Sequence, residues 1–453
     1  MSTAAGASAG PLQALASGPL AGRVRMPGDK SISHRALTLG ALAIGETVIE
    51  GVLDSDDVAA SARAMQAFGA SVTRDPSGVF RVKGVGVGGF LEPEDIVDCG
   101  DAGAMAALTL GLVASQAIAV TFNADPALRG RPLGRLLEPL RRMGAQVVAR
   151  SRDRLPLTIR GADVALPIDY RLPAASAEVK SAVLFAGLNT AGVTSIIEPI
   201  PTRDHSERML AAFGAALEID RDSEGARVIR IEGRRDLRPQ RLVVPGDPGA
   251  AAFVIVAALV IEGSDVTIEG VLVNPLRIGL IETLVEMGGD IALDNHRMVA
   301  GEPVADLRVR ASRLKGIVVP PARAASMIDD YPVLAVAAAF AEGKTVMEGL
   351  GELRQKDSDR LSALAAALAT SGIEYEEGPE SLTVTGSAHP AGGGHIAAGA
   401  DPRIAMSFLV LGLGAANAVA IDDARAAAIA FPGFAALMGG LGAHFETPEP
   451  SAR

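Results

Sequence analysis

The amino-acid sequence predicts an α/β protein made of two similar halves, each built from three copies of one strand–helix unit. The first observation is a recurring pattern of an Ala/Leu-rich helical stretch, an alternating Val/Ile strand and an amphipathic helix. The second is a Met-Pro-Gly-Asp motif at Met26 that returns as Val-Pro-Gly-Asp at Val244. The third is a small-residue pair that closes each copy, about every 70–83 residues, as expected for repeated supersecondary units. These pairs are Gly69-Ala70, Gly144-Ala145, Gly214-Ala215, Gly288-Gly289, Ser371-Gly372 and Gly442-Ala443.

The elements of the first copy follow from its periodicity. Alternating apolar and polar residues predict a strand over Thr47–Val52, and a period near 3.6 predicts a helix over Val58–Phe68. Gly69, directly after that helix, suits the left-handed residue that ends many helices. The apolar runs Ala250–Ile261 and Val333–Ala341 are shorter than the roughly 18–20 residues that span a bilayer, so we expect buried elements there.

The halves define two expected domains. The boundary near Arg241–Pro248 predicts one domain over residues 27–244 and another over residues 245–453. The N-terminal segment, residues 1–26, is expected to join the second domain. Because ligands favour interfaces between domains, we expect the functional site in a cleft between the two.

Composition excludes several classes of protein. Of 453 residues, 49% are apolar and 21% charged, which suits globular domains and excludes a disordered chain. A net charge of −11 with 3% aromatic residues and no Trp argues against nucleic-acid partners. The single cysteine, Cys99, suits a reducing compartment, and no charged, apolar leader precedes Arg23. We therefore expect a cytoplasmic protein with neither a membrane nor a nucleic-acid partner.

An anion site is predicted at the start of the first half. Lys30, Ser31 and Arg35 follow the Pro27-Gly28 turn and open a helix, where backbone N–H groups and cations together favour an anion. The alternative is an ordinary solvated helix start. The five-residue spacing of a nucleotide-binding P-loop is absent, which argues against that class.

Other motifs carry weaker signals. Gly84-x-Gly86-x-x-Gly89 fits the dinucleotide pattern, but Pro93 follows it, so we interpret the stretch as a loop. Residues 354–360 include three basic and two acidic side chains. Unless they bind a ligand, we expect these side chains to pair with one another on a solvated face. Two acids at Asp329 and Asp330 precede an apolar run, where they serve either as helix caps or as a partly buried base. Neither the histidines nor the cysteine has metal-binding spacing.

On residues 27–35 (PGDKSISHR), 352–356 (ELRQK) and 403–406 (RIAM), the sequence resembles the EPSP synthase (3-phosphoshikimate 1-carboxyvinyltransferase) family. These motifs are most similar to those of the class II, glyphosate-tolerant bacterial branch, and the similarity runs from about residue 23 to 445. The resemblance implies the two-lobed enolpyruvyl transferase fold, an inside-out α/β barrel. Each lobe would hold three βαβαββ repeats, with the substrate cleft between the lobes.

The resemblance also implies the reaction. Phosphoenolpyruvate would donate its enolpyruvyl group to the 5-hydroxyl of shikimate 3-phosphate and release phosphate by addition–elimination, a step of chorismate and aromatic amino acid biosynthesis. It implies a monomer that needs no metal or organic cofactor. Such chemistry requires cations around two phosphates and a carboxylate, together with a base and an acid.

Site residues are carried over from the resemblance position by position. Asp329 would accept the proton of the 5-hydroxyl, Lys30 would touch both substrates and take part in proton transfer, and Asp357 would be a third catalytic group. The shikimate 3-phosphate positions are Lys30, Ser31, Arg35, Ser176, Ala177, Glu178, Arg203, Asp329 and Lys356. The phosphoenolpyruvate positions are Lys30, Gly103, Arg360 and Arg403. Gly103 stands where class II enzymes carry the alanine that excludes glyphosate.

Five positions depart from the family pattern. They are Asp101 for an asparagine, Ala107 for an arginine that grips phosphoenolpyruvate, Glu178 for a glutamine, Asp357 for a glutamate and Pro402 for a histidine. Loss of the arginine alone predicts about 10- to 150-fold weaker binding of phosphoenolpyruvate. Arg129 or Arg131 could supply the missing cation.

Three hypotheses follow. The first is a working EPSP synthase. The second is a catalytically weak or inactive paralogue that binds a phosphorylated shikimate-like ligand. The third, a UDP-N-acetylglucosamine 1-carboxyvinyltransferase, fits less well, because that family's catalytic-loop cysteine and N-terminal Lys-Asn pair have no match here.

Overall fold

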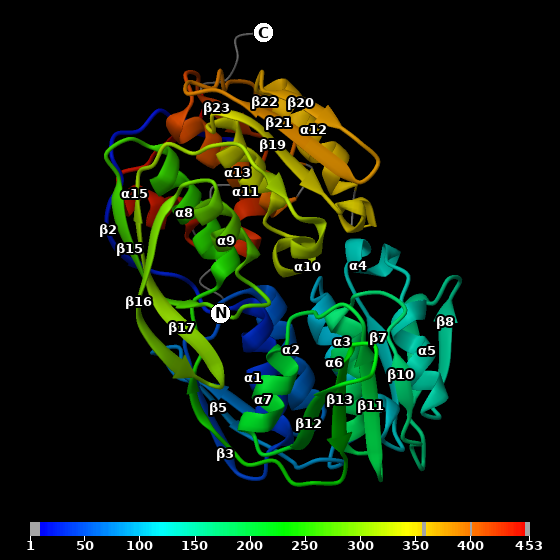
Figure 1. The fold of residues 1–453 in the computed structure, drawn as a ribbon. Coiled ribbons are helices and arrows are strands. Elements are labelled where there is room, and N and C mark those ends of the chain that lie inside the picture. The colour runs from blue at the N-terminus through cyan, green and yellow to red at the C-terminus, as the bar shows by residue number, and fades with distance from the viewer. Residues whose placement is uncertain (1–9, 356–358, 399–400, 449–453) are drawn as a thin grey trace. The chain divides into compact units, whose positions relative to one another are not determined.

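A computed structural model describes residues 10–355, 359–398 and 401–448 of the chain. The chain divides into two compact units (Figure 1). Unit 1 consists of Met1–Pro27, Gly246–Arg297 and Pro303–Arg453, and unit 2 consists of Gly28–Pro245 with Met298–Glu302.

Each unit contains three four-stranded sheets of one design. In every sheet one strand pairs in parallel at an edge, and antiparallel pairs complete the rest, as in the order β14-β3-β5-β4. The strands of unit 2 are β3 (Glu46–Glu50), β4 (Ser71–Arg74), β5 (Phe80–Lys83), β6 (Val97–Asp98), β7 (Ala119–Asn123), β8 (Gln146–Arg150), β9 (Arg154–Arg160), β10 (Asp169–Arg171), β11 (Val193–Glu198), β12 (Ala216–Arg221), β13 (Arg227–Glu232) and β14 (Arg241–Val243). Those of the unit 1 sheets are β1 (Leu12–Leu15), β2 (Ala21–Arg25), β15 (Asp265–Leu272), β16 (Asp290–Val299), β17 (Glu302–Arg310), β18 (Val318–Val319), β19 (Gly343–Glu348), β20 (Glu374–Glu377), β21 (Ser381–Gly386), β22 (His395–Ile396), β23 (Val419–Ile421) and β24 (His444–Glu446).

The core of each unit is built around buried, largely apolar helices. Unit 2 holds α1 (Lys30–Leu42), α2 (Asp56–Ala67), α3 (Gly103–Ala114), α4 (Pro126–Gly130), α5 (Gly134–Arg142), α6 (Ala177–Leu188) and α7 (His205–Ala212). Unit 1 holds α8 (Pro248–Val260), α9 (Gly279–Glu286), α10 (Ala324–Met327), α11 (Tyr331–Ala339), α12 (Arg360–Thr370), α13 (Pro402–Gly414), α14 (Ala424–Ala430) and α15 (Phe434–Gly440), with 3-10 turns at Pro321–Arg323 and Gly351–Gln355. In unit 1, α8, α11 and α13 pack against one another, and in unit 2, α3 contacts α1 and α6. α3, α8 and α11 have no charged residue and are buried because no face is polar.

The predicted elements of the first repeat are confirmed. The strand is β3 and the helix is α2, each within two residues of the expected ends. Gly69 has φ +95°, and the helix-ending glycines of the other five copies also adopt positive φ, as the terminating role requires. The Gly84–Gly89 stretch lies outside helices and strands, as its interpretation as a loop predicted.

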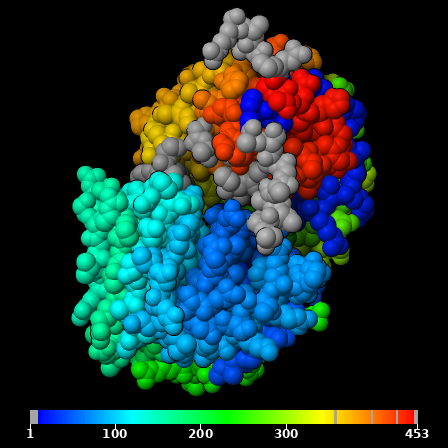
Figure 2. Space-filling model, turned by 180° about the vertical axis from the view of Figure 1, so that it is seen from behind, coloured from blue at the N-terminus to red at the C-terminus, as the bar shows by residue number. Residues whose placement is uncertain are grey.

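The N-terminal strands complete sheets of unit 1. β1 lies between β23 and β24 and is antiparallel to both, and β2 pairs in parallel with β15. Figure 2 shows this blue N-terminal segment among the red C-terminal residues. Within the described ranges no helix combines the length and the apolar character that crossing a bilayer demands.

Candidate functional site

The start of α1 presents Lys30 at the rim of unit 2. Asp29 caps the helix by accepting a hydrogen bond from the Ile32 N–H at 2.8 Å, and it is buried. The Lys30 ammonium group pairs with the carboxylate of Asp57 at the start of α2. Because the Lys30 side chain is 40% exposed, it is both oriented by a carboxylate and accessible to a ligand.

Arg35 lies one turn further along α1 and is buried. It donates from Nε to Ser206 Oγ at 2.8 Å, from a terminal nitrogen to Ser181 Oγ at 2.9 Å, and from the other to the Ser31 carbonyl at 3.0 Å. Burial lowers the pKa of this guanidinium group, Asp29 and Glu207 oppose that effect, and the charge of Arg203 adds to it. Arg203, whose charge acts on Arg35, lies two residues before α7.

His34 occupies the interior beside these cations. Its Nδ1 lies 2.7 Å from Ser61 Oγ, and the ring is fully buried. Burial, followed by the charges of Lys30 and Arg35, lowers the pKa of His34 to about 3. The ring is therefore neutral at ordinary pH.

The start of α6 holds three of the predicted residues. Ser176 caps the helix by accepting from the Val179 N–H at 3.3 Å, and Ala177 and Glu178 form its first turn. The carboxylate of Glu178 pairs with Arg131, the residue directly after α4. This helix start is therefore not a simple anion site, because it carries its own carboxylate.

Arg131 also lies against Gly103, the first residue of α3. A Cβ atom built on Gly103 would come within 3.2 Å of a terminal nitrogen of Arg131. Ala107, where the family pattern has an arginine, is buried one turn further along α3. Of the two arginines that the sequence offered as a replacement cation, the structure brings Arg131, not Arg129, to Gly103 and Glu178.

In unit 1, Asp401 joins the two predicted arginines. Arg360 donates from Nε to Asp401 Oδ2 at 2.6 Å and from a terminal nitrogen to Asp329 Oδ1 at 3.2 Å. Asp401 also caps α13 by accepting from the backbone N–H of Arg403 at 2.9 Å. Asp329, Arg360 and Asp401 thus form one cluster, while the Arg403 side chain donates to the Gly249 carbonyl at 2.8 Å. Pro402 occupies the first position of α13.

The paired acids of the sequence differ in their surroundings. Asp330 is buried and accepts from Arg277 at 2.6 Å and from Arg403 at 3.4 Å. Burial disfavours the charged form of Arg277, but the carboxylates of Asp330 and Asp247 favour that form more strongly. The pKa of Arg277 is therefore raised. The Asp329 side chain is 25% exposed against 2% for Asp330, so Asp329 is the acid that a substrate can reach. Sequence reasoning missed Arg277, which lies 53 residues from its partner.

The predicted residues therefore form two sets. Lys30, Ser31, Arg35, Gly103, Ser176, Ala177, Glu178 and Arg203 lie in unit 2, and Asp329, Arg360 and Arg403 lie in unit 1. Lys356 and Asp357 lie outside the described residues. Within the part of the chain that the structure describes, no three His, Cys, Asp or Glu side chains are grouped to hold a metal ion.

Comparison with known proteins gives matches along nearly the whole chain. A family model described as EPSP synthase (3-phosphoshikimate 1-carboxyvinyltransferase) matches residues 15–438. The chain is 56% identical over 439 residues to the 3-phosphoshikimate 1-carboxyvinyltransferase of Parvibaculum lavamentivorans, covering 97% of each protein. It is 55% identical over 438 residues to that of Rhodospirillum rubrum, covering 96% of this chain and 97% of the relative.

Solved structures give the same result for the fold. The EPSP synthase of Acinetobacter baumannii superposes with a TM-score of 0.87 at 37% identity, covering 97% of this chain and all of that one. The enolpyruvyl transferase NikO from Streptomyces tendae has a TM-score of 0.74 at 19% identity, covering 98% of this chain and all of that one, which is a likeness of fold alone. The fold class predicted from the sequence is confirmed.

Proposed function

Because the chain belongs to the EPSP synthase family, we propose that it transfers the enolpyruvyl group of phosphoenolpyruvate to the 5-hydroxyl of shikimate 3-phosphate. The observation that carries the proposal is the Arg35 guanidinium group, which the Ser31 carbonyl, Ser181 and Ser206 anchor and which feels the charge of Arg203. A phosphate monoester is bound well by a guanidinium group whose remaining N–H groups point in a fixed direction. The paralogue without activity is not favoured, since relatives more than half identical are named for this reaction.

Shikimate 3-phosphate is assigned to the helix starts of unit 2 and to Asp329. Backbone N–H groups at the start of α1 add to the charges of Lys30 and Arg35. The binding residues are Lys30, Ser31, Arg35, Ser176, Ala177, Glu178, Arg203, Asp329 and Lys356. Phosphoenolpyruvate is assigned to Lys30, Gly103, Arg360 and Arg403, joined by Arg131 because of its position over Gly103. We propose that the two units are the family's two lobes, and that the protein acts as a cytoplasmic monomer.

The reaction needs a base that the 5-hydroxyl of shikimate 3-phosphate can reach. Asp329 takes the proton of the 5-hydroxyl as that oxygen attacks the second carbon of phosphoenolpyruvate, while the Lys30 ammonium group gives a proton to the methylene carbon. Phosphate then leaves, the methyl group returns a proton, and the vinyl group is restored. Lys30 stabilises the anionic oxygens throughout, because its ammonium group is exposed at the rim.

Phosphate release from shikimate 3-phosphate and millimolar phosphoenolpyruvate tests the proposal, with Asp329→Asn as the variant. We expect turnover in the unchanged protein and its loss in Asp329→Asn, with binding of shikimate 3-phosphate retained in calorimetry. Asp153→Asn is the matched control, since Asp153 pairs with Arg141 on the surface of unit 2. Unchanged turnover in Asp329→Asn would overturn the assignment of the base. Absence of turnover in every form would overturn the function.

A further inference from the structure

Arg35 is held in place by two hydroxyl groups that no sequence motif indicated. Its Nε and one terminal nitrogen donate to Ser206 on α7 and Ser181 on α6. The two hydroxyls lie 2.7 Å apart, and Ser181 donates to the Ala177 carbonyl at 2.6 Å. Because each hydroxyl has one proton, Ser206 donates to Ser181, and both oxygens accept from Arg35.

This arrangement fixes the orientation of the guanidinium group. Three of its five N–H groups are used by Ser206, Ser181 and the Ser31 carbonyl. Two remain without a partner among the residues that the structure describes. A planar group anchored at three points presents its remaining N–H groups in a fixed direction, which favours a ligand with matching oxygens.

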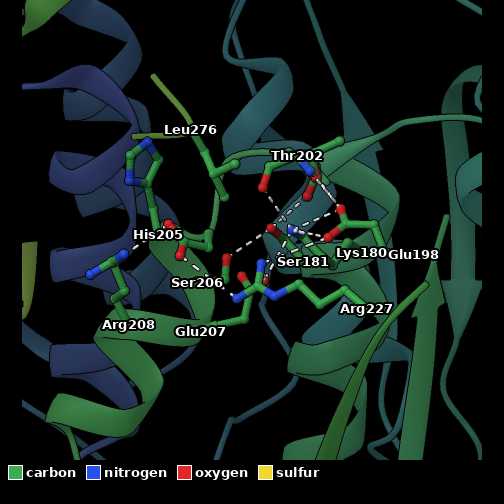
Figure 3. A network of polar contacts seen from close by, with 12 residues as sticks. Lys180, Ser181, Glu198, Thr202, His205, Ser206, Glu207, Arg208, Arg227 and Leu276 are labelled. Carbon is green, nitrogen blue, oxygen red and sulfur yellow. Dashed lines mark hydrogen bonds and ion pairs between the residues drawn. The ribbon is translucent and has the colours of Figure 1, made fainter. Parts of the chain in front are cut away.

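A buried ion pair lies directly behind the two serines (Figure 3). Lys180 precedes Ser181 on α6, and Glu207 follows Ser206 on α7. The Lys180 Nζ lies 3.0 Å from Glu207 Oε1, and the side chains are 0% and 1% exposed. The pair therefore joins α6 to α7 one residue from the hydroxyls that hold Arg35.

Further contacts fix the pair itself. Lys180 Nζ lies 2.9 Å from the fully buried carboxylate of Glu198 and donates to the Thr202 carbonyl at 3.3 Å. Arg227 lies 3.3 Å from the same Glu207 oxygen. Figure 3 shows these side chains converging from α6, α7, β11 and β13.

Replacing a buried ion pair by apolar residues of similar volume is often neutral or stabilising, so this pair is weak evidence of a role in stability alone. Ion pairs specify direction and register, which apolar packing does not. Here the register that matters is that of Ser181 against Ser206, because a shift of either helix would break the bond between the hydroxyls and release Arg35.

We propose that Ser181 and Ser206 are positioning residues for Arg35, and that the Lys180–Glu207 ion pair holds the two serines in register. The ligand oriented by Arg35 is the phosphorylated substrate, so the inference rests on the proposed function. Lys180 and Glu207 act through the serines and touch no substrate.

Ser206→Ala tests the proposal in two backgrounds, with dissociation constants for shikimate 3-phosphate measured by calorimetry. We expect about tenfold weaker binding when Arg35 is present, and a change of less than about twofold in an Arg35→Met background, because the effect passes through Arg35. Equal weakening in both backgrounds, or none in either, would overturn the proposal. Ser115→Ala is the matched control, since Ser115 is a buried serine of unit 2 whose hydroxyl donates to the Leu112 carbonyl at 3.4 Å.

Glu207→Gln tests the ion pair while keeping the shape of the side chain. We expect at least about threefold weaker binding of shikimate 3-phosphate, with kcat at saturation within about twofold of the unchanged protein. An unchanged dissociation constant would remove the ion pair from the proposal.

A crystal structure of Ser206→Ala gives a result that needs no ligand. The guanidinium group of Arg35 should leave its present place, and an unmoved guanidinium would overturn the proposal. If the unchanged protein fails to bind shikimate 3-phosphate at millimolar concentration, the proposed function is wrong. The crystal structure of Ser206→Ala then decides whether the two serines position Arg35.

Discussion

Arg131 donates two hydrogen bonds to Glu178, at 2.6 Å to Oε2 and 3.4 Å to Oε1. The two side chains are 43% and 40% exposed, so the pair lies at the surface of unit 2. Since Ala107 provides no charge, Arg131 is the guanidinium group beside Gly103. The carboxylate of Glu178 is thus already paired with Arg131, the guanidinium group that an anionic substrate at Gly103 would use.

Replacing Glu178 by Gln should therefore strengthen binding of phosphoenolpyruvate. The change frees Arg131 and removes a like charge, and a hydrogen bond to a charged group contributes about 1.5–3 kcal/mol. We expect the KM for phosphoenolpyruvate to fall at least about tenfold in steady-state kinetics. Thermal stability should change little, because exposed ion pairs contribute at most about 1 kcal/mol. Glu232→Gln, which opens the exposed Arg235–Glu232 pair, is the control, and an unchanged KM in Glu178→Gln would contradict the expectation.

Asp401→Asn should weaken phosphoenolpyruvate binding through Arg360. Asparagine caps helices about as well as aspartate, so α13 should keep its start, but Arg360 loses the charged partner at 2.6 Å. We expect the KM for phosphoenolpyruvate to rise about tenfold, with binding of shikimate 3-phosphate within about twofold. Asp423→Asn is a close control, because Asp423 also caps a helix of unit 1 and pairs with an arginine. Equal effects of the two variants would mean that the cap, not Arg360, matters.

Burial of His34 predicts a loss of stability in mild acid. Its pKa is lowered from 6.5 to about 3 in the folded protein, so the unfolded chain binds the proton first. The contribution of His34 is therefore complete above about pH 6.5 and is lost as the pH falls towards 3, by about 1.4 kcal/mol per pH unit.

Urea unfolding of the unchanged protein and His34→Gln, at pH 7 and pH 5, measures this effect. Between these values the unchanged protein should lose about 2 kcal/mol more unfolding free energy than the variant. The exposed His296 serves as a control, since His296→Gln should leave the pH dependence as it was. Parallel losses in all three proteins would show that His34 is protonated equally in the folded and unfolded states.

Cys99 should be inert to thiol reagents in the folded protein. Its side chain has no exposed surface, and burial, followed by the charge of Asp98, raises the pKa of the thiol to about 12. At pH 8 we expect its reaction with a disulfide reagent to be at least about 100-fold slower than that of free cysteine. The same protein in urea should react fully, and rapid labelling of the folded form would reveal local opening at the end of β6.

The sequence predicted the repeats and their ends because those signals are local. Gly69 and its counterparts need positive φ, and the apolar runs that became α8 and α11 need burial, whatever surrounds them. Arg131 was only one of two options, because its direction depends on how the turn after α4 is placed against α6. Partners distant in the chain, such as Arg277 and Asp330, share no local pattern.

The sequence around Lys180 indicates that the side chain is buried, but it does not indicate which residues pair with it. A single lysine in the first turn of a helix that is apolar from Ala182 onward indicates burial, and burial requires a carboxylate. Which carboxylate it finds depends on how β11 and α7 pack on α6. Only the structure identifies Glu198 and Glu207 as the partners and the serines beside them as the support of Arg35.

The place of β1 between β23 and β24 affects how the protein must be made. Leu12 pairs with Ile421, so on a ribosome the first strand emerges some four hundred residues before either neighbour exists. All strands of unit 2 pair within residues 46–243. Until their partners are synthesised, β1 and β2 have unpaired edges, which favour aggregation. Their brevity, four and five residues, limits that exposure. Unit 2 can therefore fold during translation, whereas the sheet that contains β1 forms only after β24 has left the ribosome.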